Sequence, residues 1–241
     1  MTVLVIGAAG TIGKACVTAL AASGVDQLVA VDLTAPSLPG IEARSLDVTK
    51  VDQVTTLIRE LDARSPIVGV IYAAGLNTTG EVDTIDWEEY ERVMAVNLRG
   101  AFHVGSALME VLRIKPREMG SVFISSTAGL RGEAGGSIYC ASKFALIGFT
   151  TSFAGEIAQF GGRANVVCPG NVDSPMLSKL AATIGQRQGL SGEAMLDRWI
   201  NSSAFRRLID PREVGETCAW LVSSRSSGVS GQVIVVDGPL A

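Results

Sequence analysis

The sequence has few of the residues on which metal sites and disulfides depend. Among its 241 residues there is one histidine, His103, and there are four cysteines. We therefore expect neither a His-ligated metal site nor a Ser-His-Asp triad. Cys16, Cys140, Cys168 and Cys218 are 124, 28 and 50 residues apart, so no close pair has the spacing of a metal motif. Scattered cysteines are typical of reduced thiols, which predicts a cytoplasmic protein without a bound metal.

The sequence also lacks an excess of positive charge and a long apolar run. Twenty Lys and Arg residues against 24 Asp and Glu residues give a net charge of −4, which argues against a nucleic-acid partner. No run approaches the ~20 apolar residues of a membrane span, and the N-terminus has no basic region or cleavage site of a signal peptide. A hydrophobic fraction of 47% is enough for one well-packed domain.

Short β-branched runs alternate with segments of helical spacing. We expect strands at residues 3–6, 27–32, 67–75, 121–126, 164–170 and 232–238, and helices at 12–23, 50–63, 87–113, 139–160 and 211–223. Nearly continuous apolar strands are typical of a parallel sheet that is buried on both faces. The alternation predicts an α/β fold over residues 1–241, a single-domain doubly wound parallel sheet (Rossmann fold) with helices on both faces. Residues 174–210 interrupt the alternation without a strand, which indicates a functional segment.

The first turn, "GAAGTIG", places glycines at positions 7, 10 and 13 between a strand and a helix. Backbone amides at a helix N-terminus form an anion site. Gly7 would allow the tight turn, Gly13 the close packing of the helix, and Gly10 the approach of a pyrophosphate. A plain turn between strand and helix is the alternative for this motif alone.

Asp32 ends the second expected strand, 19 residues after Gly13. An acid at this position accepts hydrogen bonds from the adenosine ribose of NAD. Its carboxylate would repel the additional phosphate of NADP, and no basic residue precedes Gly13 within the turn or directly follows Asp32. A strand-end acid that caps a turn is the alternative. Taken with the glycine turn, the spacing predicts NAD as the cofactor, with NADP disfavoured.

Tyr139 and Lys143, in "YCASK", share one face of an expected helix because they are four residues apart. A free tyrosine has a pKa near 10, and an ammonium one turn away is expected to lower it towards the working range. Ser125 and Ser126 end the preceding strand, at the edge where parallel sheets bind ligands. Asn97 lies in mid-helix, where asparagine is locally unfavourable. Each feature alone has a structural explanation, namely an amphipathic helix or a buried amide at a kink.

These motifs together resemble the short-chain dehydrogenase/reductase superfamily from residue 3 to residue 238. After the glycine turn and Asp32 the matching segments are "DVT" (47–49), "AAG" (73–75), "VNLRGAF" (96–102), "ISSTAG" (124–129), "YCASK" (139–143), "CPGNVDSPM" (168–176) and "VSGQVIVVDG" (229–238). The resemblance implies a catalytic set of Asn97, Ser126, Tyr139 and Lys143. Ser126 is preferred to its neighbour because it precedes Tyr139 by thirteen residues.

The resemblance also implies a reaction and a cofactor site. A hydride would pass between nicotinamide and the carbon of a secondary alcohol or ketone. Tyr139 would exchange the hydroxyl proton, Lys143 would tune Tyr139 and hold the nicotinamide ribose, Ser126 would polarise the oxygen, and Asn97 would anchor a water of a proton relay. The expected cofactor-binding residues are Gly7, Gly10, Thr11, Ile12, Gly13, Asp32, Leu33, Asp47, Val48, Ala73, Ala74, Gly75, Tyr139, Lys143, Pro169, Gly170, Val172 and Ser174.

The sequence departs from the superfamily's pattern at several positions. In the turn, Ile6 replaces threonine and Thr11 takes the place of a glycine, and we expect the Thr11 amide to face the cofactor phosphates. The turn's spacing resembles a longer, epimerase-like branch, but we expect no further domain after "VVDG". An epimerase or dehydratase that recycles NAD remains open. "YAAG" lacks the usual asparagine, and Ser174 stands where threonine is usual.

Residues 174–210 correspond to the substrate lid of the superfamily. Their apolar side chains predict an uncharged, fairly hydrophobic substrate of small to medium size. Gly185, Gly189 and Gly192 would permit lid movement. The lid's basic residues, Arg187 among them, could instead meet an anion, although a solvated outer face is the preferred interpretation. Glu133, after the serine strand, is expected to border the pocket or to contact only solvent.

Two other functions remain open at this point. A 3-oxoacyl-(acyl-carrier-protein or CoA) reductase is the nearest alternative, in which Arg117 could meet an acidic carrier. Phe160 stands where a second basic residue would be needed, and such enzymes generally use NADP, which Asp32 disfavours. A non-catalytic NAD sensor is a further alternative. Small and apolar residues in the helix after Tyr139 predict a homotetramer, a dimer of dimers, as the superfamily commonly forms.

Overall fold

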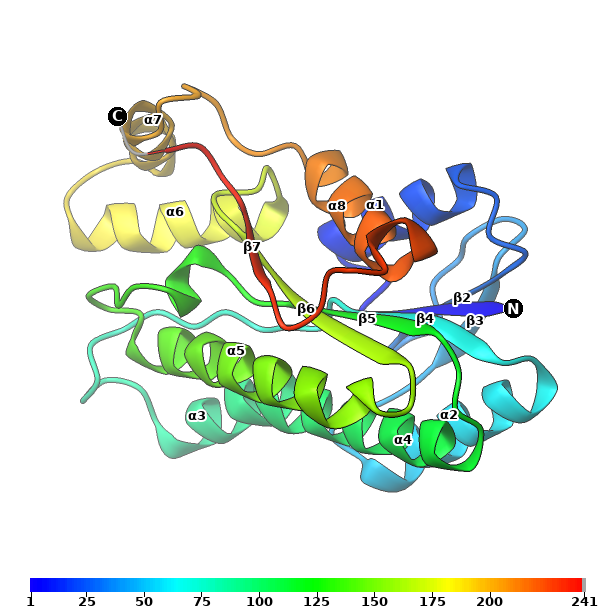
Figure 1. Ribbon diagram of the computed structural model, residues 1–241. Helices are drawn as coiled ribbons and strands as arrows, with labels where there is room; N and C mark the ends of the chain where they lie inside the picture. Colours follow the sequence, from blue (N-terminus) through cyan, green and yellow to red (C-terminus); the bar gives the residue numbers. More distant parts are fainter. Residues whose placement is uncertain (240–241) are drawn as a thin grey trace.

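The computed structural model describes residues 1–239. In that part of the chain, seven strands form one parallel sheet in the order β3-β2-β1-β4-β5-β6-β7 (Figure 1). The order reverses between β1 and β4, and the carboxyl ends of these two strands flank the crevice in which such sheets bind ligands. The strands are β1 (Thr2–Ile6), β2 (Gln27–Asp32), β3 (Glu42–Ser45), β4 (Ile67–Tyr72), β5 (Met119–Ile124), β6 (Gly162–Pro169) and β7 (Val233–Val236).

Helices cover both faces of this sheet (Figure 1). Two of them, α1 and α8, lie on one face, and α2 to α5 lie on the other. The remaining two, α6 and α7, follow β6 and lie on the side of α1 and α8. The doubly wound Rossmann fold predicted from the sequence is thereby confirmed. The helices are α1 (Thr11–Ala22), α2 (Val51–Arg64), α3 (Trp87–Met94), α4 (Gly100–Ile114), α5 (Ser137–Ala158), α6 (Pro175–Arg187), α7 (Gly192–Ser202) and α8 (Pro211–Val222).

Strand β1 shows why its run of apolar residues is continuous. Leu4 and Ile6 point into the hydrophobic core beneath the sheet, on the side of α2 and α4. Val3 and Val5 point into the other core, against α1 and α8. Because successive side chains of a strand alternate between faces, a strand that is covered on both sides needs apolar residues at every position.

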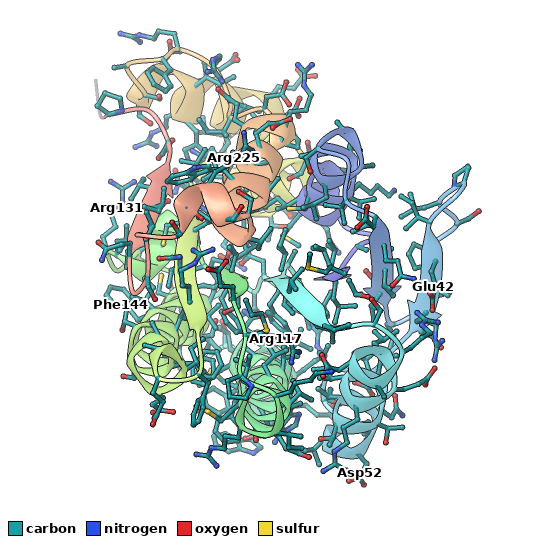
Figure 2. All side chains as sticks on the ribbon, turned by 45° about the vertical axis from the view of Figure 1, so that its right-hand side comes forward. Glu42, Asp52, Arg117, Arg131, Phe144 and Arg225 are labelled. Atoms are coloured by element: carbon teal, nitrogen blue, oxygen red, sulfur yellow. The ribbon has the colours of Figure 1, made fainter. Side chains whose placement is uncertain are left out.

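Strand β3 was not expected from the sequence. It pairs only with β2, so it is the edge of the sheet. Its four residues, "EARS", are half-buried or exposed, and Figure 2 shows Glu42 at this outer edge. Edge strands need no apolar run, and charged side chains protect them from pairing with other chains. The pattern of buried residues used for the other strands therefore could not find β3.

The single helix expected over residues 87–113 is interrupted. One π-helical turn, Ala95–Arg99, joins α3 to α4. At this turn Tyr72, the last residue of β4, donates a hydrogen bond from its hydroxyl to the Val96 carbonyl, at 2.6 Å. Tyr72 opens "YAAG", the segment that lacks the asparagine expected from the resemblance. A tyrosine thus joins strand to helix at this position. π turns are often found at functional sites.

The sequence predicts no membrane-spanning segment, and the helices of the structure can be compared with this expectation. No helix within residues 1–239 is both long enough and apolar enough to cross a bilayer.

Candidate active site

The glycine turn is closely packed at its first and third glycines. Gly7 has φ +86°, and a Cβ there would overlap the backbone of Ala73 and Ala74 at the end of β4. A Cβ on Gly13 would overlap the Gly7 carbonyl. Gly10 is different, since a Cβ there would lie 3.4 Å from the Gly7 carbonyl oxygen. It is the N-cap of α1, and the first turn of α1 contains no acidic residue. The positive end of the α1 dipole is therefore available to an anion.

Asp32 is held against this turn by two backbone amides. Its Oδ2 accepts a hydrogen bond from Ala9 N at 2.8 Å, and its Oδ1 accepts one from Leu33 N at 2.7 Å. The only cation on the neighbouring β3 is Arg44, and it is already paired. Its guanidinium lies 2.6 Å from a carboxylate oxygen of Glu60 and 3.3 Å from one of Glu42. The fold thus places the Asp32 carboxylate beside the glycine turn, with no unpaired arginine on β3.

The expected adenine residues lie beside Asp32, after β3. The Asp47 carboxylate accepts hydrogen bonds from the amide and hydroxyl of Thr49, at 2.9 and 2.7 Å, and this lowers the pKa of Asp47. Val48 is buried, and its carbonyl accepts a hydrogen bond from Nδ1 of His103, 3.0 Å away on α4. His103 is thus a packing residue that supports the segment expected to contact adenine. Leu33, another of the expected cofactor-binding residues, is 68% exposed, whereas Val48 is buried.

The serine and the tyrosine of the predicted catalytic set meet at the carboxyl end of β5. Ser126 caps a short 3-10 turn through its hydroxyl, which accepts a hydrogen bond from Ala128 N at 3.1 Å. Burial raises the pKa of Tyr139 to about 12, and a hydrogen bond with Ser126 opposes this rise. Ser125 faces away, because its buried hydroxyl donates to the Lys143 carbonyl at 2.9 Å. Of the two serines, Ser126 is the one beside the phenol.

Lys143 is buried next to this pair. Its Nζ donates a hydrogen bond to the Ile124 carbonyl at 2.9 Å and lies 5.7 Å from the centroid of the Tyr139 ring. Burial lowers the pKa of Lys143 to about 8. We expected the ammonium to lower the pKa of Tyr139, but the largest effect on that phenol is its own burial. In this structure the lysine is directed at a backbone carbonyl rather than at the tyrosine hydroxyl.

Asn97 is completely buried within the π turn. Its Oδ1 accepts a hydrogen bond from Leu76 N at 2.8 Å, and its Nδ2 donates to Leu76 O and to Ser142 Oγ, both at 2.9 Å. The amide therefore ties the loop after β4 to α5. Gly75 lies between Asn97 and Lys143, since a Cβ there would be 3.6 Å from Asn97 Oδ1 and 3.3 Å from Lys143 Nζ.

A pocket with a volume of about 170 Å³ opens beside Ser126 and Tyr139. Five of the expected cofactor positions also line it, namely Ile12, Pro169, Gly170, Val172 and Ser174. Its far wall is apolar and comes from α6, through Met176, Leu177, Leu180 and Ile184. The pocket is also lined by polar residues that were not predicted from the sequence, namely Asn77, Thr78 and Thr79 after β4 and Asn171 after β6. Their positions after the carboxyl ends of parallel strands could have identified them.

The segment 174–210 forms a tight pair of helices, α6 and α7. Two of its three glycines are packing residues, because a Cβ on Gly185 would lie 2.9 Å from the Leu190 carbonyl oxygen and one on Gly192 would lie 3.1 Å from Ala182 Cα. Only Gly189, with φ +70°, has open space around it. Of the three glycines expected to permit movement, two therefore fix the helices to each other.

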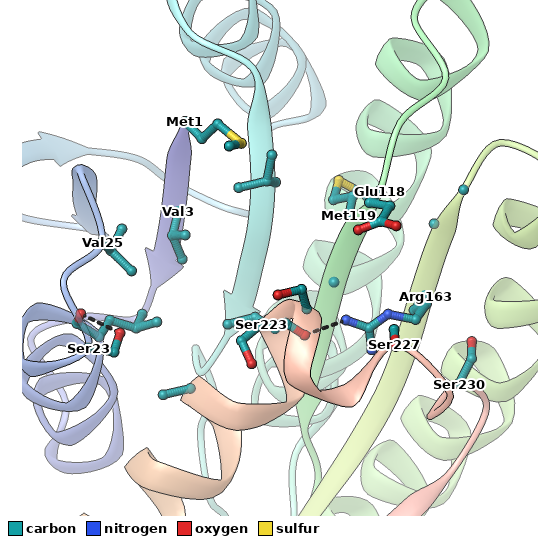
Figure 3. Close-up of a pocket in the computed structure, with 18 of the residues that line it drawn as sticks. Met1, Val3, Ser23, Val25, Glu118, Met119, Arg163, Ser223, Ser227 and Ser230 are labelled. Atoms are coloured by element: carbon teal, nitrogen blue, oxygen red, sulfur yellow. Dashed lines mark hydrogen bonds between the residues drawn. The ribbon is translucent and has the colours of Figure 1, made fainter.

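A second pocket, with a volume of about 770 Å³, lies at the amino ends of the strands (Figure 3). Met1, Val3 and Met119 line it, but none of the predicted site residues does. Three charged residues line it, Asp26, Glu118 and Arg163, and the Arg163 guanidinium has a structural role. It donates hydrogen bonds to the carbonyls of Leu221, Ser223 and Val229 and to Ser226 Oγ, at 3.0 to 3.2 Å, and so holds the end of α8.

The described residues contain no cluster of potential metal ligands. Nowhere in residues 1–239 do three His, Cys, Asp or Glu side chains gather so that they could hold a metal ion. The four cysteines are free thiols and are buried.

The chain is similar to known proteins over almost its whole length. A family model described as enoyl-(acyl carrier protein) reductase matches residues 7–240. A 3-oxoacyl-[acyl-carrier-protein] reductase of Thermotoga maritima is 31% identical, over 98% of this chain and 96% of the relative. Dehydrogenase/reductase SDR family member 6 of Danio rerio is 30% identical, over 98% and 96%. Among solved structures, ligand-free aldohexose dehydrogenase of Thermoplasma acidophilum is similar with a TM-score of 0.89 at 28% identity, over 98% of this chain and 92% of that chain.

Proposed function

Since the chain belongs to the short-chain dehydrogenase/reductase superfamily, and is an oxidoreductase that acts on CH–OH or keto groups with a nicotinamide cofactor, we propose that it interconverts a secondary alcohol and a ketone with NAD. The observation that carries the proposal is the meeting of Ser126, Tyr139 and Lys143 beside a small pocket at the carboxyl edge of the sheet. We further propose that residues 1–241 form a single catalytic domain in which 174–210 is the substrate lid.

The structure fits a dinucleotide at several points. The close-packed turn and the unneutralised N-terminus of α1 suit a pyrophosphate, with the amides of Thr11 and Ile12 facing it, while the Gly10 amide donates a hydrogen bond to the Gly7 carbonyl at 3.2 Å. The Asp32 carboxylate suits the ribose hydroxyls of NAD. The extra phosphate of NADP would lie near that carboxylate, and Arg44 would have to leave Glu42 and Glu60 to meet it. These contacts favour NAD over NADP.

Each residue of the catalytic set has a role that follows from its position. When bound, the nicotinamide supplies the hydride chemistry. Tyr139 takes the hydroxyl proton of the alcohol in oxidation and returns it in reduction. Ser126, at the same pocket, donates a hydrogen bond to the substrate oxygen. Lys143 has donors besides the one on Ile124, and these would hold the nicotinamide ribose. Asn97 would anchor the relay water at the π turn through an acceptor oxygen, because both hydrogens of its side-chain amide are donated to Leu76 and Ser142.

The pocket supports an uncharged substrate of small to medium size. Its α6 wall is apolar, and the polar groups opposite it are Asn77, Thr78, Thr79 and Glu133. Glu133 carries the one charged side chain among the described residues that line the pocket, and a carboxylate there disfavours an anionic substrate. A secondary alcohol or ketone can place an apolar part against α6 and its oxygen towards the polar groups opposite.

A 3-oxoacyl thioester reductase is the second candidate, because a reductase of this kind from Thermotoga maritima is 31% identical. The structure weakens its expected link to an acidic carrier. The Arg117 side chain, labelled in Figure 2, is only 13% exposed, and its guanidinium is paired with the Asp62 carboxylate. It also donates hydrogen bonds to the carbonyls of Ile67 and Lys115, at 3.0 and 2.9 Å. Arg117 is thus occupied within the fold, and Phe160 packs against the core.

An NAD-linked oxidation screen tests the proposal and separates it from its alternatives. Secondary alcohols, diols and hydroxyacyl thioesters are offered with NAD, and the absorbance of NADH is followed. We expect NADH to appear with a secondary alcohol or diol. A strong preference for the thioesters, with NADP in place of NAD, would support the second candidate. Tight NAD binding without turnover of any compound would support a sensor and contradict the proposal.

We also propose that the protein is a cytoplasmic homotetramer. Phe102 on α4 and Phe144 on α5 are 56% and 44% exposed, and Figure 2 shows Phe144 on the outer side of α5. Gly148 and Gly155 leave open space along the same helix. Such a face buries apolar surface when it meets another copy. Light scattering at micromolar concentration should give four times the mass of the chain, and a monomeric mass would contradict this.

The proposed cytoplasmic location is supported by the cysteines. The four buried free thiols suit a reducing compartment.

A further inference from the structure

Arg187, the last residue of α6, is hydrogen-bonded to Thr79, which lines the pocket. Its Nη2 donates a hydrogen bond to the Thr79 carbonyl at 2.6 Å, and its Nη1 donates one to Thr79 Oγ1 at 3.2 Å. Thr79 in turn donates from Oγ1 to the Gly135 carbonyl at 3.0 Å, and Gly80 N donates to the same carbonyl at 2.8 Å. Three segments therefore meet at Thr79, namely the end of α6, the loop after β4 and the loop before α5.

Through Arg187, the end of α6 that is remote from β6 is attached by hydrogen bonds to the loop after β4. At its base the α6–α7 pair is fixed by the β-bridge between Val172 and Ile209 and by two hydrogen bonds of Ile209, with Asn171 and Asp173. Within the described residues 1–239, every other hydrogen bond made by residues 175–202 stays in the pair or goes to 171–174 and 203–210. The position of α6 over the pocket is thus set by its base, by apolar packing and by Arg187.

The position of α6 determines the width of the pocket. Its residues Met176, Leu177, Leu180 and Ile184 form the wall that faces Ser126 and Tyr139. The volume of about 170 Å³ includes the space beside the expected cofactor positions Val172 and Ser174, and even so it is below the roughly 300–1,000 Å³ of pockets that accept drug-sized ligands. Because Gly185 and Gly192 pack α6 tightly against α7, the wall can recede only as part of the helix pair, and Arg187 is the side chain that opposes this.

We propose that Arg187 is a specificity-determining residue, which holds α6 against Thr79 and thereby restricts the pocket to small secondary alcohols and ketones. This inference rests on the proposed function, because it concerns the substrates of the same site. The sequence left open that Arg187 meets an anionic substrate. The structure favours the present role, since both terminal nitrogens of the guanidinium already donate to Thr79 and Arg187 is absent from the pocket lining.

The variants Arg187→Gln and Arg187→Lys test the proposal, with Arg198→Gln as the matched control. Arg198 is an exposed arginine of α7 whose contact, with Gln188 Oε1 at 3.1 Å, stays within residues 174–210. The first measurement is hydrogen exchange on the cofactor-free protein. In Arg187→Gln the amides of 175–187 and of the loop 76–80 should exchange several-fold faster. They should be unchanged in Arg198→Gln and intermediate in Arg187→Lys, whose ammonium can donate to the Thr79 carbonyl.

The second measurement is the kinetics of NAD-linked oxidation of a small alcohol, 2-butanol, and a bulky one, 1-phenylethanol. In Arg187→Gln we expect KM for 2-butanol to rise about three- to tenfold, with kcat changed less than about twofold, because two charge-assisted hydrogen bonds at an exposed site are lost. The KM for 1-phenylethanol should stay the same or fall. The kcat/KM for 2-butanol divided by that for 1-phenylethanol therefore falls in Arg187→Gln. In Arg187→Lys this ratio should return part of the way to the value of the unaltered protein.

Different outcomes contradict different steps. Unchanged exchange in Arg187→Gln would show that Arg187 does not hold α6, and would overturn the proposal. If hydrogen exchange became faster but the kcat/KM ratio of the two alcohols stayed the same, the specificity role would be overturned. Arg187 would then make a purely structural contact. A complete lack of turnover in the unaltered protein would count against the proposed function, while the exchange measurement would still decide whether Arg187 holds α6.

Discussion

Replacement of Tyr139 by phenylalanine is expected to lower kcat by about 10²- to 10⁴-fold, the usual contribution of general acid–base catalysis. The phenyl ring fits the same space, so only the hydroxyl beside Ser126 is lost. Because that hydroxyl is the group proposed to exchange the substrate proton, chemistry should fail while the cofactor still binds. We expect the Kd of NAD, measured by quenching of protein fluorescence, to change less than about twofold.

The pH dependence of the unaltered protein supplies a second readout of the same residue. Burial holds the pKa of Tyr139 at about 12 and that of Lys143 at about 8 in the cofactor-free protein. Both shifts are towards the neutral side chain, but at pH 7 the Lys143 amine is still mainly the ammonium, whereas the Tyr139 phenol carries its proton. Oxidation of the alcohol needs that proton removed, and kcat/KM for oxidation should therefore rise with pH above 7, by at most about tenfold per unit for one proton. Reduction needs the protonated phenol, which a pKa of about 12 preserves, so kcat/KM for reduction should stay nearly constant over the same range.

Tyr90→Phe is the matched control for Tyr139→Phe. Tyr90 lies on α3, stacked on Trp87, and does not line the pocket beside Ser126. Loss of its hydroxyl should leave both kcat and the pH profile unchanged. If Tyr139→Phe retained turnover and the rise with pH, another group would have to exchange the proton, and the acid–base role of Tyr139 would be wrong.

The strands at the centre of the sheet could be predicted because burial leaves a local pattern. β1, β4, β5 and β6 are covered on both faces, which requires the apolar runs that the sequence displays. β3 leaves no such pattern because it is a short edge strand of half-exposed residues. The interruption of the helix at Ala95–Arg99 was also hidden, although Asn97 in mid-helix was a sign of it. The low helix propensity of asparagine indicated that the helix is irregular at Asn97, but it did not indicate a π-helical turn.

Within the site, the residues that could be predicted are those whose role depends on short spacing. Tyr139 and Lys143 share a helix face, and Ser126 ends a strand, so their neighbourhood follows from regular geometry. The contact of Arg187 with Thr79 joins residues 108 positions apart, and no local pattern indicates it. The pKa of Tyr139 was hidden for a related reason. It depends on how deeply the phenol is buried and on where Lys143 points, and both are set by packing across the sheet.

Asp32→Ala is expected to weaken NAD binding by roughly 10- to 100-fold, equivalent to the roughly 1.5–3 kcal/mol of hydrogen bonds to a charged group. Binding of NADP should change little or improve, because the carboxylate that would repel its extra phosphate is gone. The change also removes the acceptor for Ala9 N, 2.8 Å away, so part of the loss reflects a looser glycine turn. A looser turn weakens both dinucleotides equally, and the ratio of the two Kd values therefore isolates the effect on the ribose.

Asp26→Ala separates this effect from a general loss of negative charge. Asp26 precedes β2 at the opposite end of the strand from Asp32, and its side chain is 79% exposed. Calorimetric titration with NAD and with NADP should give the same two Kd values for Asp26→Ala as for the unaltered protein. If Asp32→Ala weakened NAD and NADP equally, Asp32 would act only by holding the turn. The preference for NAD would then need another origin. Arg44 would become the next residue to test, because Glu42 and Glu60 keep its guanidinium from an added phosphate.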